Sequence, residues 1–198
     1  LRDDSFLVTG SKETALRVYR LSNNDASTAS DDDSMSPLRC NFVGTIQRTG
    51  RGRTVNLVTD SQGQMLGCTG TDDEIEIFYF FTPEESMKRL TKRLKKVSIK
   101  SDADACKEMS LTDEIKRIGS IKAKEKVKSI DLLMGATGEL RVGVVFGSNL
   151  VRLYSLDTAT KHPEATLIRS IAQQGHHSEC RSVCFSSDNL AIASGSGD

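Results

Sequence analysis

Residues 66–78 read LGCTGTDDEIEIF. A short apolar run ends at the small residues of Thr69-Gly70-Thr71, two aspartates follow, and polar and apolar residues then alternate strictly up to an aromatic residue. The same phrase occurs at residues 7–19, at residues 144–154 and, in part, at residues 192–198. Alternation with period two indicates β-strands, and the small residues between them suit a tight turn. A phrase repeated along one chain predicts a repeat architecture in which each copy supplies two strands.

Complete units of this repeat contain four candidate strands. Residues 42–80 form one such unit, with a turn at residues 61–64 in which Gly63 can take a positive φ. With two inserted segments set aside, the units are about 40 residues long, which is the length of a four-stranded propeller blade. The predicted division is the end of a blade at 1–21, an acidic Ser/Asp insert at 22–41, a blade at 42–80, a basic insert at 81–112, a blade at 113–156 and the start of a further blade at 157–198.

The overall composition narrows the class of protein. The 198 residues carry 27 Lys and Arg against 27 Asp and Glu, which argues against a wholly basic nucleic-acid binder. No apolar run is as long as the ~18 residues that a membrane span needs. Five cysteines, an odd count, suit free thiols in a reducing compartment. Because the chain begins at Leu1 and shows strand patterns from residues 5–19, we expect an internal piece of a longer protein.

A glycine–histidine pair, Gly175-His176, precedes a candidate strand, and Asp198 follows the small residues of the last repeat. This arrangement resembles the WD40 repeat. The resemblance implies that His176 hydrogen-bonds to Asp198 and that a serine of the second strand, here Ser182, joins them. It implies an all-β, WD40-type β-propeller segment of four-stranded antiparallel blades, here with one inserted basic helix or tail. The Trp-Asp pair that closes such repeats is replaced by Tyr19-Arg20, Phe78-Tyr79 and Tyr154-Ser155.

Longer phrases carry a more specific resemblance. Residues 48–78, 108–133 and 184–194 resemble the tandem WD40-propeller subunits of the UTP-B subcomplex, a part of the small-subunit processome. That resemblance implies a non-catalytic scaffold in the nucleus and nucleolus that serves ribosomal RNA processing and ribosome biogenesis. The implied partners are other WD40 and helical subunits, pre-rRNA and a box C/D snoRNA. The alternative is a generic WD40 protein–protein interaction module in another complex.

The acidic insert reads SNNDASTASDDDSMS at residues 22–36, with four aspartates, five serines and no basic residue. Such a composition cannot bury enough apolar area to offset the entropy of ordering, so a solvated loop is one interpretation. The other is a tract for an acid-directed kinase, because Ser30 precedes three aspartates. Phosphate on Ser30 would then add charge to a loop that already repels itself.

The basic insert predicts a helix at residues 82–100. Thr82 can cap it, Pro83 suits its first turn, and residues 87, 90, 94 and 97 form an apolar stripe. Three interpretations stay open: a helix packed on its own propeller or on a partner, an element that holds RNA phosphates, or a membrane-surface helix. The candidate RNA-backbone contacts are Lys88, Arg89, Lys92, Arg93, Lys95 and Lys96.

A second basic segment, QRTGRGRTV at residues 47–55, places Arg48, Arg51 and Arg53 around two glycines between candidate strands. It lacks the Gly-Lys-Ser/Thr ending of a phosphate-binding P-loop, so we do not expect nucleotide binding. A structural loop and an RNA-backbone contact are the two interpretations, since loops are where the partners of a rigid scaffold usually dock.

Several groups look chemical without predicting chemistry. Cys180 and Cys184 lie near two histidines, but on one strand they would be about 13 Å apart, too far to share a metal ion. We interpret His176 as structural and the acidic residues at positions 72–76 as turn and strand-face residues. An enzyme with an active site spanning blades would need a convergent catalytic set, which the sequence does not suggest. We therefore expect no metal, no cofactor and no enzymatic activity.

Overall fold

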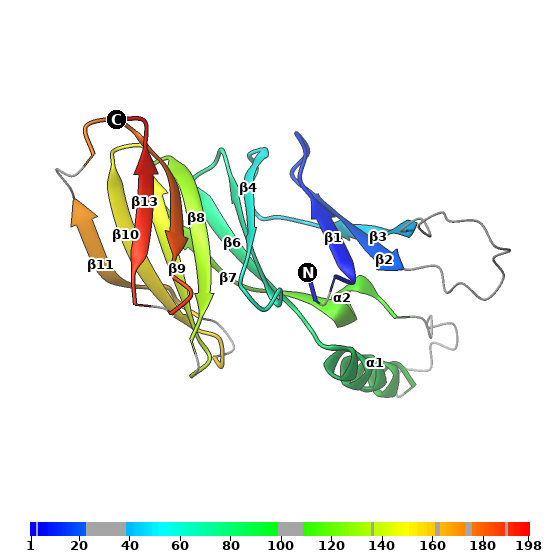
Figure 1. The fold of residues 1–198 in the computed structure, drawn as a ribbon. Coiled ribbons are helices and arrows are strands. Elements are labelled where there is room, and N and C mark those ends of the chain that lie inside the picture. The colour runs from blue at the N-terminus through cyan, green and yellow to red at the C-terminus, as the bar shows by residue number, and fades with distance from the viewer. Residues whose placement is uncertain are drawn as a thin grey trace, which may run out of the picture.

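The computed structural model describes residues 1–2, 4–22, 39–98, 109–135, 137–160, 163–172, 176–188 and 190–198. Its strands form antiparallel sheets that follow one another in chain order, with the two helices below them (Figure 1). The candidate phosphosite Ser30 and most of the acidic insert lie outside the described residues.

Four sheets account for the strands in the described part of the chain. The first sheet contains β1 (Phe6–Thr9), β2 (Leu16–Ser22) and β3 (Arg39–Ile46). The second contains β4 (Thr54–Thr59), β5 (Met65–Gly70), β6 (Glu74–Phe80) and β7 (Ile115–Lys122). The third contains β8 (Val127–Met134), β9 (Glu139–Phe146), β10 (Leu150–Asp157) and β11 (Thr166–Ala172), and the fourth contains β12 (Cys180–Phe185) and β13 (Ile192–Ser196).

The sheets correct the predicted grouping of strands into blades. The predicted unit at residues 42–80 opens with β3, but β3 pairs with β2 of the first sheet. Likewise the predicted unit at residues 113–156 opens with β7, but β7 pairs with β6. The reason is that alternation identifies a strand without identifying its partner. In both cases the true partner lies across an insert, so the four-strand units begin one strand later than predicted.

This topology gives every sheet two distinct ends. β2, β6 and β10 each pair antiparallel with the outermost strand of their sheet, and these three strands finish at the same end of the sheets. We call this the helix end. The opposite end, here the loop end, holds the connections between sheets at residues 47–53 and 123–126 together with the β5–β6 and β9–β10 turns.

Apolar side chains fill the space between successive sheets. Phe6, Leu16 and Phe78 belong to a cluster between the first two sheets, and Ile77 and Leu132 to a cluster between the second and third. β5 is buried at every position because a sheet covers each of its faces. A blade of this kind is therefore stabilised by its neighbours on both sides.

Local turn and helix signals agree with the structure. Gly63 has φ +66°, which is the positive value expected for the turn after β4. The basic insert contains α1 (Pro83–Ser98), which confirms the predicted helix. A reciprocal cap opens it: Thr82 N donates to Glu85 Oε2 at 2.9 Å, and Glu85 N donates to Thr82 Oγ1 at 3.3 Å.

The packed face of α1 differs from the predicted stripe. Met87, expected on the apolar face, is 53% exposed, whereas the neighbouring Ser86 is buried. The helix packs instead on α2 (Leu111–Glu114), a single turn that precedes β7. Polar groups of α2 bind arginines of α1, so ion pairing sets the rotation of the helix as well as apolar spacing does.

Candidate interaction surfaces

Arg48 is the loop arginine whose prediction the structure corrects. Its side chain is 0% exposed, so it cannot contact RNA. Nε donates to Glu76 Oε2 at 2.9 Å, Nη1 donates to the Gly52 carbonyl at 2.8 Å, and Nη2 lies 3.4 Å from Asp72 Oδ1. Arg51 and Arg53, from the same loop, are exposed. Sequence spacing grouped the three arginines, but only the fold separates the buried one from the others.

Glu76 is the centre of this buried polar network. Its side chain is 0% exposed, and its Oε1 accepts from Thr49 N at 2.8 Å, from Thr49 Oγ1 at 2.7 Å and from Arg117 Nη1 at 3.1 Å. Burial alone would raise the pKa of Glu76, but these donors and the Arg48 charge together hold that pKa below its usual value. The missed signal was a carboxylate sharing a strand face with Phe78, which indicates burial with a partner.

Acid should weaken this network. Burial would raise the pKa of Asp72 as well. Hydrogen bonds from backbone N–H groups, chiefly that of Gly52, and the charge of the Arg48 guanidinium nevertheless lower this pKa. In the folded protein the pKa values of Glu76 and Asp72 lie below their ordinary values of 4.5 and 3.8. The two carboxylates therefore contribute their full stabilisation above those ordinary pKa values, and this stabilisation is lost as the pH falls through the folded pKa values. We expect the urea unfolding midpoint to drop between about pH 5 and pH 3. A Glu76→Ala variant should show a smaller drop, and an equal drop would contradict the assignment.

The histidine arrangement implied by the WD40 resemblance occurs at the start of the fourth sheet. His176 Nδ1 lies 3.2 Å from Asp198 Oδ1, and Nε2 lies 3.1 Å from the hydroxyl of Ser194. The expected serine, Ser182, is not the one in contact with the ring. Ser182 lies on β12, opposite Gly195 of β13. Ser194 lies on β13, opposite Val183 of β12. Ser194 lies on β13, the strand that leads to Asp198, which is why it and not Ser182 of β12 contacts the ring.

The second sheet uses a guanidinium where the fourth uses an imidazole. Arg48 precedes β4 and pairs with Asp72 in the turn after β5, just as His176 precedes β12 and pairs with Asp198 after β13. Both pairs connect the segment leading into a sheet to the residues that follow the second strand of that sheet. The second sheet therefore lacks the Gly-His pair of the WD40 repeat but has an ion pair between the corresponding two positions.

The arginines of α1 are engaged within the chain. Arg89 stacks over the Phe81 ring at 4.1 Å, and its Nη2 donates to the Thr112 carbonyl at 3.1 Å. Arg93 binds Asp113 Oδ2 through Nη2 at 2.8 Å and through Nε at 3.1 Å. These two candidate RNA contacts therefore anchor the helix. The other four candidates have exposed side chains: Lys88, Lys92, Lys95 and Lys96.

The two predicted basic segments lie at opposite ends of the second sheet. Arg51 and Arg53 are at the loop end, where β6 begins, and α1 follows Phe80 at the helix end. The seven residues of β6 span about 20 Å at ~3.3 Å per residue. One phosphate cannot reach both segments, so they form two separate candidate surfaces.

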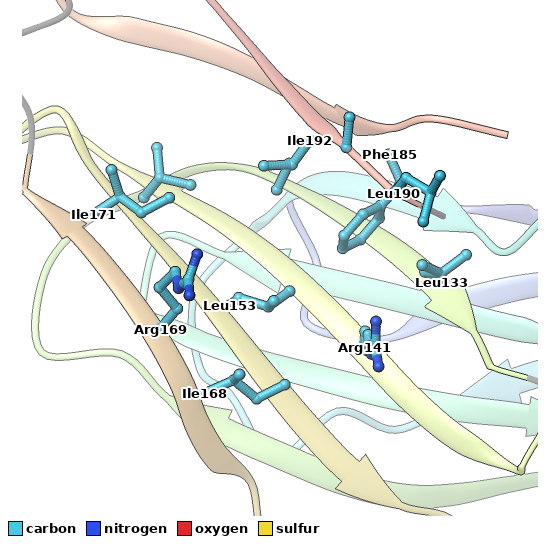
Figure 2. Close-up of a pocket in the computed structure, with 11 residues that line it drawn as sticks. Leu133, Arg141, Leu153, Ile168, Arg169, Ile171, Phe185, Leu190 and Ile192 are labelled. Carbon is cyan, nitrogen blue, oxygen red and sulfur yellow. The ribbon is translucent and has the colours of Figure 1, made fainter. Parts of the chain in front are cut away.

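A cavity of about 290 Å³ lies between the third sheet and the β12–β13 sheet (Figure 2). Its lining is aliphatic and aromatic, as at Leu153 and Phe185, apart from Arg141 and Arg169. The residues around this cavity include no acid, base or nucleophile of the kind that catalysis needs. Ile168 and Leu190 in its lining are exposed, so the cavity is an open apolar cleft between the two sheets.

Among the residues that the structure describes, no cluster of three or more His, Cys, Asp or Glu side chains has the geometry to hold a metal ion. Cys180 is buried and Cys184 exposed, because a bulge after Cys180 shifts the register of β12. Neither helix in this part of the chain is long and apolar enough to cross a membrane.

Solved structures with a similar arrangement establish the fold. The β-propeller domain of Cps50 (Swd1) from Myceliophteria thermophila matches with a TM-score of 0.50 at 12% identity, covering 90% of this chain and 42% of that chain. The C-terminal WD40 domain of Sif2 matches with a TM-score of 0.51 at 10% identity, covering 92% of this chain and 37% of that chain. The fold is a segment of a WD40-type β-propeller.

Sequence relatives of this WD40 segment carry the same kind of repeat in their names. The mouse protein (Mus musculus) called WD repeat-containing protein 3 is 36% identical over 187 residues, covering 89% of this chain and 20% of the relative. The protein of that name from Homo sapiens is 39% identical over 171 residues, covering 81% of this chain and 18% of the relative. The chain thus spans about one fifth of the length of these relatives. No family model matches it.

This segment has the architecture of a WD40-type propeller. Its sheets present connections at both ends, and loops on a rigid framework are where binding groups are usually found. The parts of this segment outside the sheets include α1 and the connections at the loop end.

Proposed function

We propose that this WD40 segment is part of a non-catalytic scaffold of a nucleolar ribonucleoprotein assembly that processes small-subunit ribosomal RNA during ribosome biogenesis. Its partners in this proposal are other WD40 and helical subunits, pre-rRNA and a box C/D snoRNA. The proposal is supported by the resemblance of residues 48–78 and 108–133 to the tandem-propeller UTP-B subunits. Its place in the cell, the nucleus and nucleolus, rests on the same resemblance.

The observation that carries the RNA part is the orientation of α1. Arg89 and Arg93 hold the helix against α2, and the exposed Lys92 and Lys96 line the same cleft as these arginines, so they project from a fixed platform. A fixed array of lysines costs less entropy on binding phosphates than a tail would. Contacts of this kind position an RNA without reading its sequence.

A specific observation favours the alternative, a protein–protein module in another complex. Exposed Met87 lies on α1, and a cleft of about 380 Å³ nearby is lined by Tyr79, Phe81 and Met134. Aromatic and methionine side chains are enriched at protein interfaces. Under this alternative, the helix end docks a subunit and the lysines surround the contact.

Ultraviolet crosslinking in cells tests the proposal on the full-length protein. We expect peptides from residues 84–100 to crosslink to precursor ribosomal RNA or to a box C/D snoRNA, and the protein to co-purify with processome subunits. The matched control is the same protein with Lys88, Lys92, Lys95 and Lys96 changed to Gln, which should lose those crosslinks and keep its protein partners. Co-purification with an unrelated complex, without precursor RNA, would support the alternative module instead.

A further inference from the structure

Basic side chains that the sequence separates come together at the loop end. Lys12 lies in the β1–β2 connection, and Arg51 and Arg53 lie in the connection into β4. Three lysines lie at the end of β7 and in the connection from β7 to β8. All of these side chains are exposed. We call them the basic strip, and its members are Lys12, Arg51, Arg53, Lys122, Lys124 and Lys126.

Direct contacts make this strip continuous across two sheets. Lys12 and Arg53 line the same groove, next to Thr54. One residue earlier, Gly52 N donates to Asp72 Oδ2 at 3.1 Å in the β5–β6 turn. The Asp73 carbonyl in that turn accepts from Ala123 N at 2.8 Å, and Ala123 lies between two lysines of the strip. The loops that carry Arg51, Arg53, Lys124 and Lys126 are therefore hydrogen-bonded to the same turn, and Lys12 adjoins them along the groove.

The acidic groups at this end are largely engaged with other side chains. Asp72 pairs with buried Arg48, Glu125 binds Ser148 and lies 3.7 Å from Arg152, and Glu179 pairs with Lys128. None of these cations belongs to the basic strip. Two further carboxylates border it: Glu13 follows Lys12 and pairs with Arg17, and Glu74 lies opposite Lys122 in the β6–β7 register. The six basic side chains of the strip are exposed and outnumber these two carboxylates, although the chain as a whole carries formal net charge 0.

We propose that the basic strip binds the phosphate backbone of a single-stranded RNA. This inference rests on the proposed RNA-binding function, and it assigns a second RNA surface at the end of the sheets opposite α1. Lys12, Lys122, Lys124 and Lys126 are added as phosphate contacts to Arg51 and Arg53. The strip supplies charge on rigid loops and no aromatic side chain to stack a base, so it positions RNA without selecting sequence.

The chemistry of the strip favours RNA over an acidic protein. A stable protein interface generally needs a buried apolar or aromatic anchor at its centre. The groove between Lys12 and Arg53 offers Val55 and otherwise hydroxyl and basic groups. Nucleic-acid interfaces are polar and strongly positive, which matches this composition.

Two variants of the full-length protein with equal reductions in positive charge test the inference. One carries Arg51→Gln, Arg53→Gln, Lys124→Gln and Lys126→Gln in the strip, and the other carries Gln at the four exposed lysines of α1. Binding of a fluorescein-labelled mixed-sequence single-stranded RNA is measured by anisotropy across a salt series, with a labelled poly-aspartate peptide as the second probe. We expect the strip variant to flatten the slope of log K against log salt by about 0.7 for each phosphate that the protein no longer neutralises.

Each outcome of this comparison has one meaning. A flattened slope in the strip variant, whether or not the α1 variant also changes, supports the strip as an RNA surface. An unchanged strip variant beside a weakened α1 variant overturns the inference and leaves the proposed function standing. If neither variant changes RNA binding, both the inference and the RNA part of the proposed function fail. Loss of poly-aspartate binding alone in the strip variant would assign the strip to an acidic protein and overturn the inference.

Discussion

Replacing Glu76 with alanine is expected to lower the free energy of unfolding by about 3–5 kcal/mol, the usual cost of removing one partner of a buried ion pair. The change would leave the fully buried Arg48 guanidinium with the longer 3.4 Å contact to Asp72 and one carbonyl. It would also leave Thr49 N without its acceptor. Urea denaturation at neutral pH, followed by circular dichroism, measures the effect.

The matched control is Glu74→Ala. Glu74 lies two residues away on the same strand and the same face, but it is only partly buried and accepts one long bond, 3.3 Å from Thr49 Oγ1. We expect this control to change the unfolding free energy by no more than about 0.5 kcal/mol. Similar losses of unfolding free energy in the two variants would mean that the Arg48–Glu76 pair does not hold the connection at residues 47–53 to the second sheet.

Replacing Asp113 with alanine should release α1 from the propeller. The carboxylate of Asp113 is buried, accepts both Arg93 bonds and also accepts from Ser110 N at 3.1 Å. Losing charge-assisted bonds of this kind costs about 2 kcal/mol, which corresponds to a roughly 30-fold larger open population of the helix. Limited trypsin digestion should then cleave after the lysines of α1 about 30 times faster, because cleavage follows the open population.

Thr112→Ala is the control for that measurement. The Thr112 side chain is exposed, and its contact with Arg89 is made by the backbone carbonyl, which the substitution keeps. Cleavage of α1 should therefore stay at the rate of the unchanged protein. Equal rates in Asp113→Ala and Thr112→Ala would show that the ion pair with Arg93 is not what docks the helix.

Short-range signals accounted for the features that the sequence predicted well. The strand at residues 74–80 follows from alternation, the turn at Gly63 from a residue that tolerates positive φ, and the start of α1 from Thr82 and Pro83. Each of these depends on neighbours within a few positions along the chain. Signals of that range are visible in a sequence before any tertiary contact is known.

The pairing of strands and the burial of individual side chains could not be predicted from the sequence. β7 joins β6 across residues 81–114, and no local pattern states which edge a strand will choose. Arg48 and Arg51 have similar surroundings in the sequence, yet one side chain is fully buried and the other exposed. The difference arises from Glu76, which is 28 residues from Arg48 along the chain and meets it only when the sheet forms.

By itself, the sequence determined that this chain is built from repeated antiparallel strands with one inserted basic helix, because period, turn residues and caps act over a few residues. The tertiary structure decided which strands share a sheet, which arginines are buried and which basic residues meet at the loop end. Those outcomes depend on contacts between segments far apart in the chain. Loop closure and burial against a neighbouring sheet set their free energies, and neither quantity can be read from a local stretch of residues.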